Sequence, residues 1–153
     1  MLVYRLTIQK YGKELQASGI EGRWNSRGEY VIYTASSRSL ALLENLVHRG
    51  YSGMNAPFYL FTLELPENTA IQKISKDVFT DAIKNPEGII ISRKAGSDWL
   101  RHGKTVVLEV PASVVPEESN FVLNVSHPDF QKIKVVEVKP FEIERRLKME
   151  VNS

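Results

Sequence analysis

The sequence contains no cysteine, and only three of its 153 residues are histidines. The lack of cysteine excludes disulfide bonds, cysteine-bound zinc sites and thiol nucleophiles. His48, His102 and His127 are far apart in the chain and lack the spacing of metal ligands, so we expect no metal site.

Several common motifs are also missing. There is no Gly-x-Gly-x-x-Gly or Walker A loop and no Gly-x-Ser-x-Gly turn, so neither nucleotide binding through those loops nor a serine hydrolase is indicated. No apolar run approaches the length of a membrane span, and the first residues, MLVYRLTIQKYG, lack the apolar core of a signal peptide. We therefore expect a cytoplasmic protein that does not contact a membrane.

The overall composition is that of a globular protein. Hydrophobic residues make up 42% and charged residues 25%, and 20 basic against 18 acidic residues leave a net charge of +2. This excess is too small to indicate a nucleic-acid surface. The length fits one domain with a sizeable core.

The hydrophobic pattern predicts a mixed α+β domain in which strands outnumber helices. Residues 2–9 alternate, with Leu2, Tyr4, Leu6 and Ile8 on a predicted buried face and Arg5, Thr7 and Gln9 on a polar face. Further strands are predicted over residues 30–36, 58–66, 69–75, 104–110 and 133–138, and a helix is predicted over 75–85. The apolar run at the start of residues 88–103 fits a strand, and the rest of that segment fits a helix. Residues 119–130 are predicted to be loop-like with strand fragments.

A second helix is predicted from Ser36 or Ser37, as N-cap, to near Gly50. The recurrence of Leu40, Leu43 and Val47 predicts the face that enters the core. Glu44 lies on that same face, which is an unusual place for a carboxylate.

Three residues upstream of and within this helix form a candidate site. Arg23 lies in a predicted loop, Tyr33 in a predicted strand and Glu44 on the helix. Singly, each has an ordinary explanation: a solvated cation, a core aromatic residue and a carboxylate at the edge of the buried stripe. Together they supply an anion-binding guanidinium, a flat stacking surface and a carboxylate that stabilises a nearby cation. Such a set suits cleavage of a glycosidic bond in a phosphate-bearing nucleotide.

The segment GRWNSRGEYVIYTASSRSLALLE resembles the core of the RES-domain family. The residues that match the family pattern in order and spacing are Gly22, Arg23, Asn25, Tyr33 and Glu44. Tyr4-Arg5, GSDWL, VPASVVPEESNFVLN, SHPDF and PFEIERRL resemble further family blocks in the same order. The resemblance predicts one RES domain over residues 1–147. Residues 148–153 are predicted to form a C-terminal tail with no residues that would hold it to the domain.

The resemblance implies a toxin of a bacterial type II toxin–antitoxin system that depletes NAD+ by hydrolysis or phosphorolysis. It also implies a fold similar to that of ADP-ribosyltransferase toxins, with a mixed β core and an NAD+ cleft. The implied partner is an Xre-like antitoxin that blocks the active site and binds DNA, so this chain would contact DNA only through it. NAD+ is then the substrate, and neither a metal nor a resident cofactor is implied.

The resemblance also assigns roles to individual residues. Arg23 and Arg5 would bind anionic or ribose groups of NAD+, and Tyr33 would orient the nicotinamide-ribose end. Glu44 would hold a ribose hydroxyl and stabilise the oxocarbenium ion as nicotinamide leaves.

The family serine is displaced in this chain. The family pattern places a serine directly after a proline, whereas this chain has Pro111-Ala112-Ser113. We predict that Ser113 takes the role; the alternatives are that Ser119 approaches from the loop or that the role is absent. Two rival functions stay open on the sequence: a protein ADP-ribosyltransferase and a catalytically inactive antitoxin-binding partner.

Overall fold

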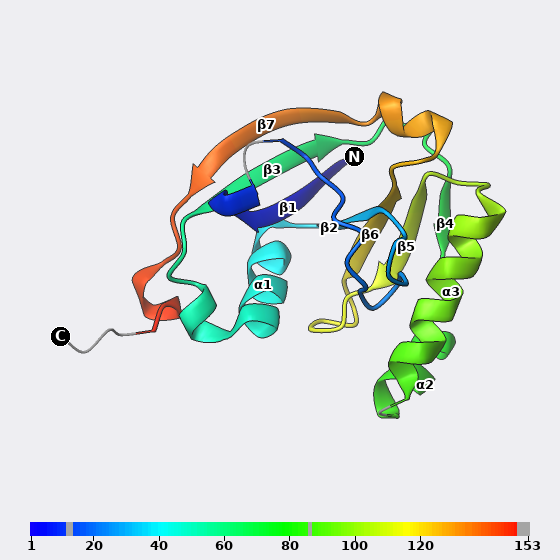
Figure 1. Ribbon diagram of the computed structural model, residues 1–153, viewed down its shortest axis with the longest axis horizontal. Coiled ribbons are helices and arrows are strands. Elements are labelled where there is room, and N and C mark those ends of the chain that lie inside the picture. The colour runs from blue at the N-terminus through cyan, green and yellow to red at the C-terminus, as the bar shows by residue number, and fades with distance from the viewer. Residues whose placement is uncertain (12–13, 86, 150–153) are drawn as a thin grey trace.

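The seven strands of the described chain form one sheet, in the order β4-β5-β6-β2-β1-β3-β7 (Figure 1). The computed structural model describes residues 1–11, 14–85 and 87–149, so residues 150–153 of the predicted tail lie outside it. The strands are β1 Leu2–Ile8, β2 Val31–Ala35, β3 Phe58–Glu64, β4 Ile71–Lys73, β5 Val107–Pro111, β6 Ser119–Asn124 and β7 Lys134–Phe141. The helices are α1 Arg38–Gly53, α2 Lys76–Lys84 and α3 Gly88–His102, with short 3-10 helices at Gln9–Tyr11, Pro128–Lys132 and Arg145–Leu147.

The sheet is mixed, because β4 pairs with β5 in parallel and the other neighbours pair antiparallel. The predicted single α+β domain with a mixed β core is confirmed. No helix in the described part of the chain has the combination of length and apolar character that crossing a membrane requires.

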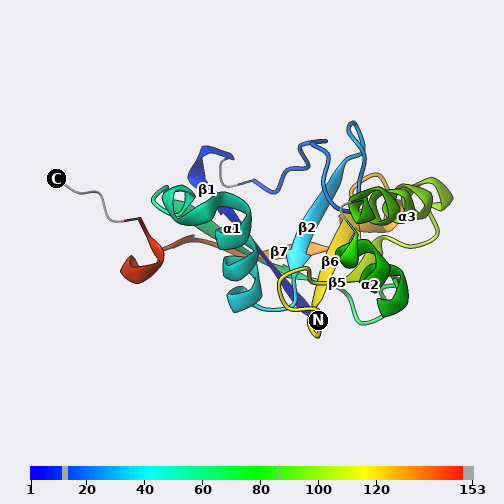
Figure 2. The same ribbon diagram turned by 90° about the horizontal axis from the view of Figure 1, so that it is seen from below.

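The helices cover one face of the sheet in two separate units. Viewed from below, α1 lies on one side and the α2–α3 pair on the other, with β2 and β6 between them (Figure 2). Leu6, Ala35 and Leu40 belong to the apolar cluster beneath α1, and Trp99, Leu108 and Val122 to the cluster beneath α2 and α3. The opposite face of the sheet carries a third cluster that includes Val3, Ile32, Phe61 and Leu123.

Strand β1 has no solvent-exposed face. It lies between β2 and β3, and Val3 and Thr7 are as well buried as Leu6, whereas Leu2 is 43% exposed. The predicted division into one buried and one polar face is therefore wrong. An internal strand whose two faces are both covered by apolar clusters buries side chains on each side, so sequence alternation alone did not reveal its position.

Helix α1 begins as the sequence predicts. The Ser37 hydroxyl accepts a hydrogen bond from the Leu40 N–H at 3.0 Å, which makes Ser37 the N-cap. At Gly50 the backbone turns to φ 70° and ψ 174°, conformations that favour glycine, and one more turn follows to Gly53. The regular helix therefore ends at the predicted glycine.

The packed face of α1 differs from the prediction. Val47 is 64% exposed, and the side chains that pack in the cluster beneath α1 are Leu40, Ala41, Leu42 and Leu46. Asn45 lies on the packed side, where its amide donates to the Leu6 carbonyl at 3.0 Å. A polar residue bound to the sheet backbone interrupts the apolar pattern, which is why the pattern indicated the wrong face. Glu44 consequently lies at the flank of the packed face.

Two regions that the sequence left uncertain are regular. Residues 88–102 are helical throughout as α3, and residues 119–124 form β6 between β5 and β2. Residues 119–130 are predicted from the sequence to be loop-like with strand fragments, and the first half is one continuous strand. The polar residues Ser119, Asn120 and Asn124 made this segment resemble a loop, although the apolar residues between them are buried in a strand.

Helix α3 packs directly on the backbone of the loop before β2. A Cβ atom added to Gly96 would lie 1.7 Å from the Trp24 carbonyl oxygen, so only glycine permits this approach. The Ser92 hydroxyl donates to the Arg23 carbonyl at 2.7 Å, and Arg93 Nε donates to the Gly22 carbonyl at 3.0 Å. The helix thereby fixes the loop that carries Arg23.

We predict that Gly96→Ala lowers the free energy of unfolding. Helix propensity alone favours alanine by about 1 kcal/mol. The clash with Trp24 requires a backbone shift, and overpacking of this kind typically costs about 1–3 kcal/mol or more. Urea denaturation measures the difference, with Lys94→Ala at an exposed site of α3 as the control. An unchanged or increased stability of Gly96→Ala would contradict the close packing.

Candidate functional site

Several of the predicted site residues lie on or beside the part of the sheet between α1 and the α2–α3 pair, which is formed by β2 and β6 and is called the strip below. Residue Ala35 of β2 lies opposite Asn120 of β6, and Tyr33 lies opposite Val122, so these four side chains share one face. Ala35 belongs to the cluster beneath α1, whereas Val122 belongs to the cluster beneath α2 and α3. Asn120 and Tyr33 therefore lie at the boundary between the two helical units.

Glu44 reaches this boundary from the flank of α1. Its carboxylate is half-buried, and Oε1 accepts a hydrogen bond from Asn120 Nδ2 at 3.0 Å. Oε2 lies 3.5 Å from the Ser113 hydroxyl, a distance at the outer limit of hydrogen bonding. One carboxylate oxygen is thus firmly held, and the other has only a weak contact within the described residues.

The structure separates the two candidate serines. Ala112 is fully buried and its N–H donates to the Glu118 carbonyl at 2.9 Å, which leaves Ser113, the next residue in the loop, beside Glu44. The Ser119 hydroxyl instead donates to Glu109 Oε1 at 2.7 Å. Because side chains alternate along β6, Ser119 lies on the opposite face of the sheet from Asn120. Ser113, not Ser119, is the serine next to Glu44.

Tyr33 is held by the loop before β2. Its hydroxyl donates to Asn25 Oδ1 at 2.5 Å and accepts from the Trp24 N–H at 3.0 Å. Burial raises the pKa of Tyr33 to about 12, even though the Trp24 N–H and the charges of Arg93 and Arg23 favour the phenolate. The ring is therefore a neutral phenol at physiological pH.

Gly22 and Asn25, which match the family pattern, shape this loop. Asn25 is fully buried, and its amide donates to the carbonyls of Ile20, Ser26 and Glu29. A Cβ atom at Gly22 would lie 2.6 Å from the Tyr33 hydroxyl. These two residues hold the Tyr33 hydroxyl in place.

The two predicted arginines both lie close to Tyr33. Arg5 Nη1 donates to the Tyr33 carbonyl at 3.1 Å, and burial lowers the pKa of Arg5, as does repulsion from Arg49. Arg23 is half-buried and near enough to act on the charge of Tyr33. In residues 1–11, 14–85 and 87–149, no ion pair joins either guanidinium to a carboxylate. In this part of the chain, neither charge is therefore neutralised by a side-chain carboxylate.

The predicted residues form two adjacent groups and not one contact cluster. Glu44 contacts Ser113 and Asn120, and no hydrogen bond or ion pair within the described chain joins it to Arg23 or Tyr33. The groups are linked by β2, since Tyr33 is two residues from Ala35, about 7 Å along the strand. The arrangement suits an elongated substrate that is anionic at one end and becomes cationic at the other.

Asn120 was not identified from the sequence. Its segment appeared loop-like, so its side-chain direction was undefined. The available signal was the alternation of Asn120, Val122 and Asn124, which is typical of a strand.

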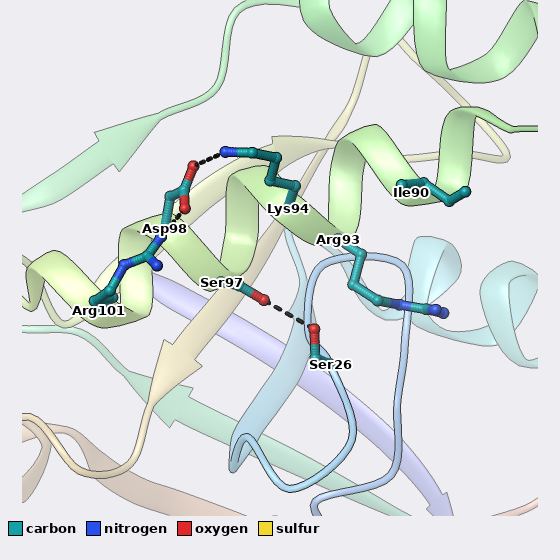
Figure 3. A pocket seen from close by; sticks show the side chains of 7 residues that line it. All are labelled: Ser26, Ile90, Arg93, Lys94, Ser97, Asp98 and Arg101. Carbon is teal, nitrogen blue, oxygen red and sulfur yellow. Dashed lines mark hydrogen bonds and ion pairs between the residues drawn. The ribbon is translucent and has the colours of Figure 1, made fainter.

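A cavity of about 410 Å³ lies where α3 meets the loop before β2 (Figure 3). It is lined by Ser26, Ile90, Arg93, Lys94, Ser97, Asp98 and Arg101. Lys94 and Arg101 both pair with Asp98, and the Ser26 and Ser97 hydroxyls lie 3.0 Å apart. None of the predicted site residues lines this cavity, and we assign it no catalytic role.

Comparison with known sequences identifies close relatives. The sequence model of the RES domain family matches residues 2–146. The chain is 35% identical over 152 residues to "Toxin Res" of Photorhabdus laumondii, covering 96% of this chain and 97% of the relative. It is 34% identical over 153 residues to "Toxin Res" of Yersinia enterocolitica, covering 97% and 100%. It is 37% identical over 134 residues to "Prs ADP-ribosylating toxin" of a Sphingobium species, covering 82% and 80%.

Comparison with solved structures finds the same fold at low sequence identity. The crystal structure of the M. tuberculosis MbcT–MbcA toxin–antitoxin complex contains a chain that aligns with a TM-score of 0.72 and 16% identity. The alignment covers 92% of this chain and 83% of that one.

We predict that Tyr33 makes stability depend on alkaline pH. Its folded pKa of about 12 exceeds its ordinary value of 10.0, so its contribution is complete below pH 10 and is lost as the pH rises to about 12. Urea denaturation between pH 8 and 12 should show a smaller loss for Tyr33→Phe than for the wild type. At neutral pH the variant should be less stable by about 1–2 kcal/mol, because two hydrogen bonds are lost. Equal losses of stability in both proteins would rule out this role of Tyr33.

Proposed function

The chain belongs to the RES domain family and is a toxin of a toxin–antitoxin system, and on this premise we propose that it cleaves the bond between nicotinamide and ribose in NAD+. The observation that carries the proposal is the half-buried carboxylate of Glu44, held on one oxygen and bordered by Ser113. Arg5 donates to the Tyr33 carbonyl and Arg23 lies near Tyr33, and within the described residues neither guanidinium forms an ion pair with a carboxylate.

The proposed reaction begins with the departure of nicotinamide. The bond between ribose C1′ and the nicotinamide nitrogen breaks, and its electron pair neutralises the positive charge of the ring. C1′ becomes an oxocarbenium ion, which a nearby carboxylate stabilises electrostatically. Nicotinamide leaves as a neutral molecule and needs no proton, so the site requires no general acid.

Each candidate residue has a role in this proposal. Glu44 stabilises the cation and holds a ribose hydroxyl through Oε2, with Ser113 at its side. Arg5 and Arg23 bind the phosphates, a task that suits planar guanidiniums. The neutral ring of Tyr33 supports the nicotinamide-ribose end by stacking. The substrate would then extend along β2, from the arginines to Glu44.

The acceptor of the ribosyl cation defines the second candidate function. Water gives hydrolysis, inorganic phosphate gives phosphorolysis, and a protein side chain gives ADP-ribosylation. The name "Prs ADP-ribosylating toxin" of the Sphingobium relative favours keeping transfer as the alternative. An inactive antitoxin-binding partner is less well supported, because Ser113 lies beside Glu44 although Ala112 replaces the family serine.

The proposed partner is an antitoxin that covers this strip of sheet and carries an Xre-like DNA-binding region. The toxin would then contact DNA only through the antitoxin. The shared fold with a chain of the MbcT–MbcA toxin–antitoxin complex supports such a partner.

We predict that Glu44→Gln strongly slows nicotinamide release from NAD+. The isosteric amide retains the shape of the side chain but cannot stabilise a cation, so the rate should fall by about 10²–10³-fold. Chromatography of purified, antitoxin-free protein with NAD+ measures the release, with and without phosphate, and thermal unfolding checks the fold. If the wild type releases no nicotinamide under either condition, the proposed function is wrong.

Further readouts of the same variant separate the alternatives. Adenine-labelled NAD+ leaves label on protein only if the chain is a transferase. Expression of the wild type should arrest growth, and expression of Glu44→Gln should not. The product of the neighbouring reading frame should relieve the arrest and bind the purified toxin; growth arrest that persists with Glu44→Gln would exclude NAD+ cleavage as its cause.

We predict that Ser113→Ala lowers kcat by about 10-fold, because it removes the hydroxyl beside Glu44 Oε2. Ser119→Ala is the matched control, since it removes a serine hydroxyl from the same hairpin but on the opposite face of the sheet. Its kcat should equal that of the wild type. Equal effects of the two substitutions would exclude a specific role for Ser113.

A further inference from the structure

We propose that Asn120 is a positioning residue that fixes Glu44 through Oε1 and thereby leaves Oε2 as the oxygen that faces the substrate. The inference rests on the proposed function, in which Glu44 stabilises the ribosyl cation. No sequence motif discussed above assigns a role to Asn120.

The hydrogen bond joins two elements that are distant in the sequence. Asn120 Nδ2 on β6 donates to Glu44 Oε1 on α1 at 3.0 Å. Asn120 has a short side chain on a strand paired on both sides, opposite Ala35 of β2 and Val110 of β5. Glu44 has a longer side chain with three rotatable bonds. The rigid amide therefore sets the orientation of the flexible carboxylate.

The Asn120 amide is not arranged for stability. Its Oδ1 atom is buried and has no hydrogen-bond partner among the described residues. Rotating the amide by 180° would direct this oxygen at the Glu44 carboxylate, where two acceptors repel each other. The observed orientation keeps the donor on Glu44 and leaves Oδ1 unsatisfied, an arrangement that disfavours folding.

Packing alone would favour an apolar residue at this position. The residues opposite Asn120 on the two neighbouring strands, Ala35 and Val110, are both buried and apolar. An unsatisfied, buried amide oxygen beside such neighbours indicates that the Glu44 contact, rather than the fold, accounts for the asparagine.

The two carboxylate oxygens then differ in availability. Oε1 accepts the strong bond from Asn120, whereas the contact of Oε2 with Ser113 is 3.5 Å long. A ribose hydroxyl can donate to Oε2 without displacing Asn120. The carboxylate is thus preorganised before the substrate binds, so its electrostatic effect needs little rearrangement during the reaction.

Two substitutions test this role, Asn120→Leu and Asn120→Asp. The apolar variant removes both the donor and the unsatisfied oxygen, so its melting temperature should equal or exceed that of the wild type. Its kcat for nicotinamide release should fall by about 10- to 100-fold, with a smaller change in KM. The aspartate variant puts a second carboxylate beside Glu44, which disfavours ionisation of the pair. The acid limb of its pH–rate profile should move to higher pH.

Asn124→Asp is the matched control. Asn124 lies on the same strand and face as Asn120, about 13 Å further along. Its Oδ1 accepts from the Ser126 N–H at 3.0 Å, a bond that aspartate retains. This variant should keep the wild-type acid limb. If it shifts that limb as far as Asn120→Asp does, the effect is not specific to Glu44, and the inference is overturned.

A readout independent of activity separates this inference from the proposed function. The ¹³C carboxyl resonance of Glu44, followed by NMR during a pH titration, should change in midpoint in Asn120→Asp and in chemical shift in Asn120→Leu. If the wild type releases no nicotinamide but these changes occur, the proposed function fails and the positioning contact stands. Unchanged kcat in Asn120→Leu, or a Glu44 resonance that neither variant alters, would overturn the inference.

Discussion

The antiparallel register between β2 and β6 is the constraint on which the candidate site depends. It sets Ala35 opposite Asn120 and Tyr33 opposite Val122, so that a residue bound to Glu44 and a residue held by the Arg23 loop face the same side. A slip of one residue would turn Asn120 to the opposite face and leave the Glu44 carboxylate without its donor. Because apolar clusters cover both faces of this part of the sheet, such a slip would also move apolar side chains out of their clusters.

The two helical units have different structural roles around this strip. Helix α1 carries Glu44 on the flank of its packed face and fastens itself to β1 through Asn45. Helix α3 contributes no predicted catalytic residue, but its Gly96 allows the Trp24 backbone to approach, and the loop so held binds the Tyr33 hydroxyl. One helix therefore presents Glu44, the proposed catalytic carboxylate, while the other fixes the loop that holds the Tyr33 hydroxyl.

Several features of the site oppose stability. Arg5 is a buried guanidinium whose pKa is lowered by desolvation, and Asn120 retains an unsatisfied amide oxygen. Both are unfavourable for folding in isolation. Such departures from good packing are expected where a protein must hold polar groups ready for a ligand. Under the proposed function, the anionic phosphates of NAD+ would pair with the Arg5 guanidinium.

The α+β class, an N-cap at Ser36 or Ser37, the helix end near Gly50 and the family could all be predicted from the sequence, because these depend on local propensity and on residue order along the chain. The sequence also singled out Arg23, Tyr33 and Glu44, but not their separation into two groups. Only the tertiary structure decided that Val47 is exposed, that β1 is internal and that Asn120 meets Glu44. The physical reason is that burial on α1 and the direction of each β6 side chain are set by pairing with strands distant in the chain, and no local pattern records that pairing.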